Sequence, residues 1–107
     1  MTGSTRYSAA APTREQVERL AGVAVLEFGT DWCGICAAAQ PIIRAGLATE
    51  GELKHLKVED GSGRPLGRSF HVKLWPTLIF LRDGREVARV VRPARVEEVA
   101  EALARAR

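Results

Sequence analysis

Residues 31–36 read DWCGIC, and Cys33 and Cys36 are the only cysteines of the chain. The apolar run before this stretch predicts a strand, and the pattern after it predicts a helix. Two residues between the thiols let the first helical turn bring both sulfurs together, so that one can attack a disulfide and the other can resolve the mixed disulfide. The spacing therefore predicts reversible dithiol–disulfide exchange.

The two cysteines are expected to differ in reactivity. At the start of a helix, Cys33 feels the positive end of the helix dipole and the unpaired backbone N–H groups, which favour a thiolate. Cys36 lies one turn further along and is more shielded. We therefore expect Cys33 to be the nucleophile and Cys36 to be the resolving thiol.

Three other interpretations of the cysteine pair are open. A zinc site could use both thiols together with His55 and His71, but the histidine spacing does not match the usual pattern for such sites. A structural disulfide closing so short a loop would remove little entropy from the unfolded chain. Two inert buried thiols are the third interpretation, against which Trp32 and Gly34 favour an exposed turn. We expect neither a metal nor a cofactor.

The length and composition predict one domain. With 107 residues, 46% of them hydrophobic, the chain can build a core without structural staples. Residues 1–12 are small and polar and are expected to form a flexible leader before a domain at residues 13–107. No apolar segment approaches the ~20 residues of a membrane span. We expect a cytoplasmic monomer without membrane contact, although removal of a signal sequence would leave the same appearance.

The charge of the chain is mild. Sixteen Lys and Arg against thirteen Asp and Glu give a formal charge of +3. The basic residues are spread along the chain, and a solvated surface explains them. Nucleic-acid binding needs a denser basic patch with aromatic side chains for stacking, and the chain has only two Trp, one Tyr and three Phe.

Sequence patterns predict alternating helices and strands followed by a hairpin and a last helix. Thr13 and Gln16 match a capping box at the start of a short helix. Asp83-Gly84 is typical of a tight hairpin turn, and Pro93 suits the first turn of the last helix. The other expected elements are strand Val23–Phe28, helix Cys33–Ala48 with a kink at Pro41, strand Leu53–Val58, a helical piece at Pro65–Phe70, and strands Thr77–Leu81 and Arg85–Val91.

At this point the chain resembles the thioredoxin family. The matching features are the WCGIC motif after the strand at residues 25–28, Pro41 five residues past Cys36, the Trp75-Pro76-Thr77 sequence and the Asp83-Gly84 turn. They cover the chain from about residue 13 to its end. The resemblance implies an α/β, thioredoxin-like fold with a central mixed β-sheet flanked by helices, a C-terminal β-hairpin and a closing helix.

The resemblance also implies roles for two residues near the cysteines. Pro76 is similar to the cis-proline of the family, which packs beside the active-site cysteines and whose backbone neighbour pairs with an extended substrate segment. An ordinary trans proline at a strand start is the alternative. Trp32 is similar to the surface tryptophan beside the nucleophile, with a simple packing role as the alternative.

Glu27 stands where the family usually has a buried aspartate that exchanges a proton with the resolving thiol. Burial raises the pKa of a carboxyl group, so we expect Glu27 to titrate nearer neutrality and to act as a base toward Cys36. A solvent-facing glutamate is the alternative. His55 aligns with the lysine that often pairs with that aspartate and could share the proton, or it could be a solvated or simply hydrogen-bonded histidine.

Three departures from the family concern the expected substrate surface, for which the candidates are Trp32, Gly34, Ile35, Trp75, Pro76 and Arg92. Ile35 replaces a proline, so the redox potential cannot be carried over from the family. Trp75 stands where a smaller aliphatic residue is usual and enlarges the apolar platform. Arg92 stands where the family often has glycine. Its bulky cationic side chain would favour acidic partners and hinder close approach of a substrate backbone.

Together these features predict a thiol–disulfide oxidoreductase that reduces protein disulfides. Its partners would be disulfide-containing proteins and a separate enzyme that recycles the dithiol, so no cofactor is required. A disulfide oxidase or isomerase in an exported setting would use the same residues, because direction depends on potential and recycling partner. A redox-inactive binding module that uses Trp32, Trp75 and Arg92 is an alternative of a different class.

Overall fold

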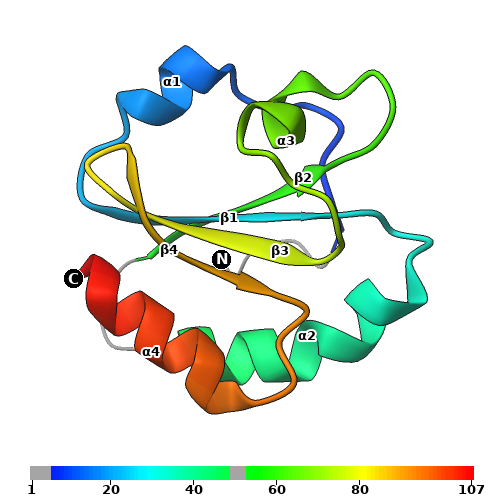
Figure 1. The fold of residues 1–107 in the computed structure, drawn as a ribbon, viewed down its shortest axis with the longest axis vertical. Coiled ribbons are helices and arrows are strands. Elements are labelled where there is room, and N and C mark those ends of the chain that lie inside the picture. The colour runs from blue at the N-terminus through cyan, green and yellow to red at the C-terminus, as the bar shows by residue number, and fades with distance from the viewer. Residues whose placement is uncertain (1–5, 49–52) are drawn as a thin grey trace.

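A four-stranded mixed sheet in the order β2-β1-β3-β4 forms the centre of the structure, with helices on both faces (Figure 1). The computed structural model describes residues 6–48 and 53–107. Within these ranges, no helix combines the length and the apolar character needed to span a membrane. The elements are α1 (Arg14–Glu18), β1 (Val23–Gly29), α2 (Gly34–Leu47), β2 (Lys54–Glu59), α3 (Pro65–Ser69), β3 (Thr77–Arg82), β4 (Arg85–Val91) and α4 (Val96–Ala106).

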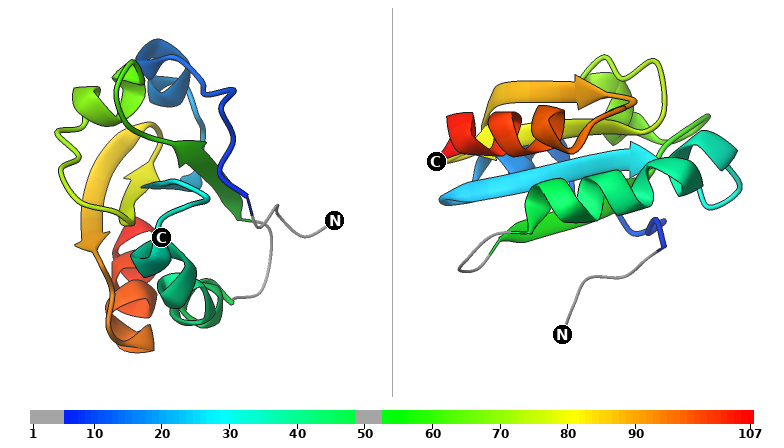
Figure 2. Two further views of the ribbon diagram at one scale, coloured as in Figure 1. Left: turned by 90° about the vertical axis from the view of Figure 1, so that its right-hand side faces the viewer. Right: turned by 90° about the horizontal axis from the view of Figure 1, so that it is seen from below.

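Strand β1 lies between β2, to which it is parallel, and β3, to which it is antiparallel. Its side chains alternate between two cores. Val25 packs in the core that α2 and α4 cover, whereas Leu26 and Phe28 pack in the core under α1 and α3. Figure 2 shows the sheet between these two helical layers. Coverage on both faces explains the nearly continuous apolar run of β1 and confirms the expected fold.

Helix α2 follows β1 after a short turn, which places the cysteine pair at the carboxyl end of the central strand. Cys33 is the N-cap residue with an extended backbone, and the helix proper begins at Gly34. Pro41 lies inside the helix. Near the other end, Gly46 lies against α4. The two helices are so close there that a Cβ atom added to Gly46 would lie 2.4 Å from Cβ of Val99. The helix predicted over residues 33–48 is confirmed to within one residue at each end.

The segment before α1 is packed against the sheet. Tyr7 is only 7% exposed, and Ser8 forms a parallel bridge with Val58 on the free edge of β2. The backbone N–H of Ser8 donates to Lys57 O at 2.8 Å, and Ser8 O accepts from the N–H of Glu59 at 2.9 Å. The expectation of a flexible leader is therefore wrong for Tyr7 and Ser8, which pair with an edge strand that the sequence pattern of residues 1–12 does not reveal.

The C-terminal hairpin and helix agree with the sequence pattern apart from the helix start. Asp83 and Gly84 both have positive φ, of 50° and 81°, as a two-residue turn between twisted strands requires. Helix α4 begins at Val96, three residues after Pro93. Glu98 Oε1 accepts from the N–H groups of Ala94 at 2.7 Å and Arg95 at 2.9 Å, so these donors are satisfied outside the helix.

Candidate active site

The two thiols occupy different environments at the start of α2. Cys33 is partly exposed, and Cys36 is buried with 1% of its surface exposed. Cys33 Sγ accepts a hydrogen bond from the backbone N–H of Cys36 at 3.1 Å. This N–H is one of the donors that a helix start leaves without a partner in the helix, so it favours negative charge on the outer sulfur. The outer thiol can reach another molecule, while the inner one is shielded.

Cys36 is a weakly acidic thiol in this structure. Burial, followed by the hydrogen bond and charge of Cys33, raises the pKa of Cys36 to about 11. A backbone hydrogen bond at Thr30 and the hydroxyl of Tyr7 act in the opposite direction. Two of the three effects that raise this pKa therefore come from the neighbouring thiol, and they depend on the chemical state of Cys33.

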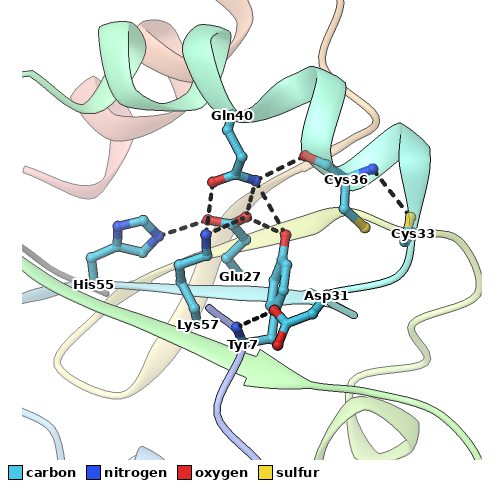
Figure 3. Close-up of polar contacts among 8 residues, drawn as sticks. All are labelled: Tyr7, Glu27, Asp31, Cys33, Cys36, Gln40, His55 and Lys57. Carbon is cyan, nitrogen blue, oxygen red and sulfur yellow. Dashed lines mark hydrogen bonds and ion pairs between the residues drawn. The ribbon is translucent and has the colours of Figure 1, made fainter. Parts of the chain in front are cut away.

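Glu27 lies beneath α2 with none of its surface exposed. Its carboxylate accepts hydrogen bonds from the Tyr7 hydroxyl, from Gln40 Nε2 at 2.9 Å and from His55 Nε2 at 2.9 Å (Figure 3). Lys57 Nζ lies 3.9 Å from Glu27 Oε2. The alternative of a solvent-facing glutamate is therefore wrong, and the carboxylate is held by groups from the N-terminal segment, α2 and β2.

The direction of the Glu27 pKa differs from the expectation. Burial pushes this pKa upward, but hydrogen bonds from His55, Tyr7 and Gln40 and the charge of Lys57 outweigh burial and hold it below its ordinary value. The expectation of a raised pKa is corrected, because it considered desolvation without the donors around the carboxylate. Glu27 is ionised at neutral pH, as a proton acceptor must be.

Lys57 and Gln40 complete the polar cluster around Glu27. Lys57 pairs with Glu27 in the parallel register of β1 and β2, so both side chains point to the α2 face. Lys57 Nζ donates to Gln40 Oε1 at 2.7 Å, and Gln40 Nε2 also donates to the carbonyl oxygen of Cys36 at 2.9 Å. Gln40 thus joins the helix turn that carries the inner thiol to the buried carboxylate.

Tyr7 enters this cluster from the N-terminal segment. Its backbone N–H donates to Asp31 Oδ1 at 2.9 Å, and Lys57 Nζ lies 4.6 Å from the centre of its ring. Its hydroxyl donates to Glu27, and it lowers the pKa of the nearby Cys36 thiol. Burial and the Glu27 carboxylate raise the pKa of Tyr7 far above its ordinary value, so the phenol stays neutral.

An aromatic surface lies next to the cysteines. Trp32 is 77% exposed and meets Trp75 edge to face, with ring centroids 5.6 Å apart. Trp75 Nε1 donates to Asp60 Oδ2 at 2.8 Å, which fixes its ring. The Trp75–Pro76 peptide is cis, as the resemblance implied, and Pro76 is buried.

Arg92 borders the other side of this surface. Its backbone is in the left-handed region with φ of 50°, where the family often has glycine. Its N–H donates to Pro76 O at 2.9 Å, and its Nε donates to Trp75 O at 2.8 Å. Arg92 also helps to line a hollow of about 200 Å³ together with the half-exposed Ile35. Gly34 is exposed beside Ile35.

The histidines do not gather around the thiols. His55 bonds to Glu27, and His71 lies in the loop after α3 with a positive φ of 60°. Over residues 6–48 and 53–107, no group of three or more His, Cys, Asp or Glu side chains is placed to hold a metal ion.

Sequence reasoning missed three residues of this site, namely Tyr7, Gln40 and Lys57. Two of them carry a signal in the sequence. Gln40 follows Cys36 by four positions and so lies on the same helix face, and Lys57 follows His55 by two positions on a strand and so shares its sheet face. Tyr7 has no periodic context, and only its position as an isolated aromatic residue in a small, polar segment sets it apart.

Comparison with known proteins agrees with this geometry. The family model Thioredoxin matches residues 6–105. The reduced form of thioredoxin 2 from Pseudomonas aeruginosa PAO1 has 62% sequence identity and a TM-score of 0.82, over 94% of this chain and 93% of that one. A thioredoxin of Chlamydia trachomatis is 38% identical over 71 residues, which are 65% of this chain and 69% of the relative. A thioredoxin of Staphylococcus aureus is 32% identical over 83 residues, 77% of this chain and 80% of the relative.

Proposed function

We propose that this chain, which belongs to the thioredoxin family and is a thiol–disulfide oxidoreductase, reduces protein disulfides with Cys33 as the attacking thiol and Cys36 as the resolving thiol. The observation that carries the proposal is the hydrogen bond from the N–H of Cys36 to Cys33 Sγ at 3.1 Å. It stabilises a thiolate on the exposed sulfur, while the second thiol is held one helical turn away in a buried position.

The reaction takes two exchange steps. In the first, the Cys33 thiolate attacks one sulfur of the substrate disulfide, and the other substrate sulfur leaves as a thiolate that takes up a proton. In the second, the Cys36 thiolate attacks Cys33 Sγ, the mixed disulfide breaks, and the second substrate sulfur leaves. The substrate gains two electrons and two protons, and the protein keeps a Cys33–Cys36 disulfide.

Mixed-disulfide formation makes Cys36 easier to ionise. The charge of the Cys33 thiolate and its hydrogen bond with the inner thiol both raise the pKa of Cys36. Once Cys33 Sγ is bonded to substrate it carries no charge, so the upward effect of that charge disappears. The resolving thiol thus becomes more acidic at the step that uses it.

Glu27 is the proposed proton acceptor for that ionisation. It is buried, ionised and hydrogen-bonded to Tyr7, whose hydroxyl lies near the Cys36 thiol. Lys57 balances its charge, and His55 is hydrogen-bonded to it. A carboxylate with a low pKa is a weak base. Glu27 can serve here because the Tyr7 hydroxyl lies between it and the thiol.

Substrate would dock over the aromatic surface. Trp32, Gly34 and Ile35 flank Cys33 in the chain, and Trp75, which precedes Pro76, meets the ring of Trp32. The backbone of Trp75 is the group expected to pair with an extended substrate segment. Its carbonyl oxygen already accepts from Arg92 Nε, so Arg92 has to share or release that oxygen when substrate pairs there. Because Arg92 is cationic, it favours acidic substrate segments.

The proposed partners are disulfide-containing proteins and a separate reductase that returns electrons to the dithiol, with the chain acting as a monomer in the cytoplasm. The relatives support disulfide reduction, and they do not favour either an oxidase or isomerase or a redox-inactive binding module.

Two serine variants test the proposal in an assay that follows reduction of a protein disulfide with a dithiol as electron source. We expect Cys33→Ser to lose activity, because the first exchange cannot occur. Cys36→Ser should lose turnover but accumulate a mixed disulfide between Cys33 and the substrate, visible by mass spectrometry without reducing agent. Activity retained in Cys33→Ser, or a mixed disulfide on Cys36 instead, would contradict the assigned roles.

A further inference from the structure

The Tyr7 hydroxyl lies between the two groups that must exchange a proton. It donates to Glu27 Oε2, and it lies near enough to the Cys36 thiol to lower the pKa of that thiol. A methyl group placed on Gly29 would lie 2.8 Å from Cys36 Sγ and 2.9 Å from Tyr7 Oη. Both atoms therefore border the same small space above β1, which a side chain at position 29 would fill.

The hydrogen-bonding capacity of the phenol fits this position. A tyrosine hydroxyl has one O–H to donate and two lone pairs that accept. The O–H is given to Glu27, and one lone pair accepts from Gln40 Nε2 at 3.3 Å. One acceptor site remains for the S–H of Cys36, whose sulfur borders the same space.

We propose that Tyr7 passes the proton from the Cys36 thiol to the Glu27 carboxylate when the mixed disulfide is resolved. The inference rests on the proposed function. The S–H bond of Cys36 breaks and its proton goes to Tyr7 Oη, while the phenol proton goes to Glu27 Oε2. Cys36 Sγ then bonds to Cys33 Sγ, and the substrate sulfur leaves with the electron pair of the broken disulfide.

Tyr7 acts in this path as a neutral carrier. The burial and the neighbouring carboxylate that raise the pKa of Tyr7 disfavour a phenolate, so the hydroxyl has to gain one proton as it gives up the other. The charged or titratable side chains near it are Glu27 on β1, His55 and Lys57 on β2, Asp31 in the turn after β1, and Cys36 and Arg44 on α2.

The N-terminal segment holds the ring in place for this transfer. The bond from Tyr7 N–H to Asp31 Oδ1 ties the segment to the active-site turn, and the two backbone bonds of Ser8 tie it to β2. A segment outside the strand–helix junction therefore supplies a hydroxyl to the buried end of the site.

The two exchange steps can be followed separately with the aromatic disulfide dithiobis(nitrobenzoate), because each step releases one coloured thionitrobenzoate. In stopped-flow reactions of the reduced protein, we expect Tyr7→Phe to slow the second release by about tenfold or more, the effect of one lost hydrogen bond to a charged group. The first release depends on Cys33. Its rate should change by less than about twofold, because Tyr7→Phe removes no contact of Cys33.

The pH profile and a double variant separate proton transfer from a structural effect. In Tyr7→Phe, the slow second step should recover as the pH rises, because hydroxide can then remove the proton. Combining Tyr7→Phe with Glu27→Gln should slow that step no further than Glu27→Gln alone, because both residues serve one path. In the unmodified protein, the second step should be slower in heavy water and the first should not, a measurement that does not depend on any variant folding.

Three results would overturn these assignments in different ways. An unchanged second step in Tyr7→Phe would show that the proton takes another route, such as water in the hollow of about 310 Å³ that Tyr7, Cys36 and Gln40 help to line. Slowing that is equal at every pH would show that Tyr7 only positions Cys36. Loss of the first release in the unmodified protein would instead contradict the proposed function, because the attack by Cys33 would be missing.

Discussion

The side chain of Arg92 donates a hydrogen bond from Nε to the carbonyl oxygen of Trp75 at 2.8 Å. This contact places a cation at the edge of the aromatic surface and occupies a backbone group next to the cis-proline. Arg92 makes this contact from a left-handed backbone, a conformation that glycine adopts without strain.

Arg92→Gly should broaden the range of disulfides that the protein reduces. We expect the preference for acidic over neutral peptide disulfides, measured as the ratio of kcat/KM, to fall by about two- to fivefold, as for loss of one surface charge pair. Arg92→Lys is the matched control, since it keeps the charge but lacks the planar donor group. It should retain the preference for acidic peptides. Equal ratios in all three proteins would contradict a role of Arg92 in selectivity.

The acidity of Cys36 should depend on Cys33. Both the hydrogen bond and the charge of Cys33 help to raise the pKa of Cys36 to about 11. In Cys33→Ala these influences are gone, so the pKa of Cys36 should fall below about 11 while burial still keeps it above that of a free cysteine. Ultraviolet absorbance of the thiolate during a pH titration measures this value. An unchanged pKa would show that burial alone sets the acidity of the inner thiol.

Glu27 should make stability depend on pH in the acid range. Its folded-state pKa lies below its ordinary value of 4.5, so the unfolded chain binds the proton more readily. The stabilisation is therefore complete above about pH 4.5 and is lost as the pH falls through the lower folded-state value. Denaturant unfolding at neutral and acid pH measures this loss.

Glu27→Gln should remove most of that pH dependence. At pH 7 we expect it to lower the free energy of unfolding by about 2 to 3 kcal/mol, because the buried donors lose a charged acceptor. Glu101→Gln, on the exposed face of α4, is the control and should change stability by less than about 0.5 kcal/mol. A Glu27→Gln variant with the acid sensitivity of the unmodified protein would contradict the lowered pKa.

The contact between α2 and α4 should not tolerate a side chain at Gly46. A Cβ atom there would lie 2.4 Å from Val99 Cβ and 3.1 Å from Val96 O. Gly46→Ala should therefore lower the free energy of unfolding by about 1 to 3 kcal/mol, despite the higher helix propensity of alanine. Gly34→Ala in the same helix meets no atom within 4 Å and should leave stability unchanged or slightly higher. Equal stability of both variants would contradict the close helix packing.

Local sequence patterns predicted most of the fold because its elements follow local rules. The apolar run of β1, the cysteine pair at a helix start and the Asp83-Gly84 turn each act over a few neighbouring residues. The start of α4 was missed because the Glu98 side chain satisfies two N–H groups that precede the helix. That contact depends on a conformation which Pro93 alone does not determine.

The site was less predictable because it combines distant segments. The burial of Glu27 follows from its central strand, but the direction of its pKa depends on donors from three separate parts of the chain, among them Tyr7 and His55. Tyr7 gains its place only when its segment pairs with the edge of β2. No local pattern carries that information, since the interaction is created by the folded sheet.

The most direct test of the central claim is the equilibrium reduction potential of the Cys33–Cys36 couple in glutathione redox buffers, read by mass spectrometry after the free thiols are trapped. We expect a single intramolecular disulfide with a potential near −270 mV, about that of a disulfide reductase. A potential of about −180 mV or higher would contradict the reductase direction and favour an oxidase or isomerase. Failure to form the disulfide at any potential would contradict dithiol chemistry at this site.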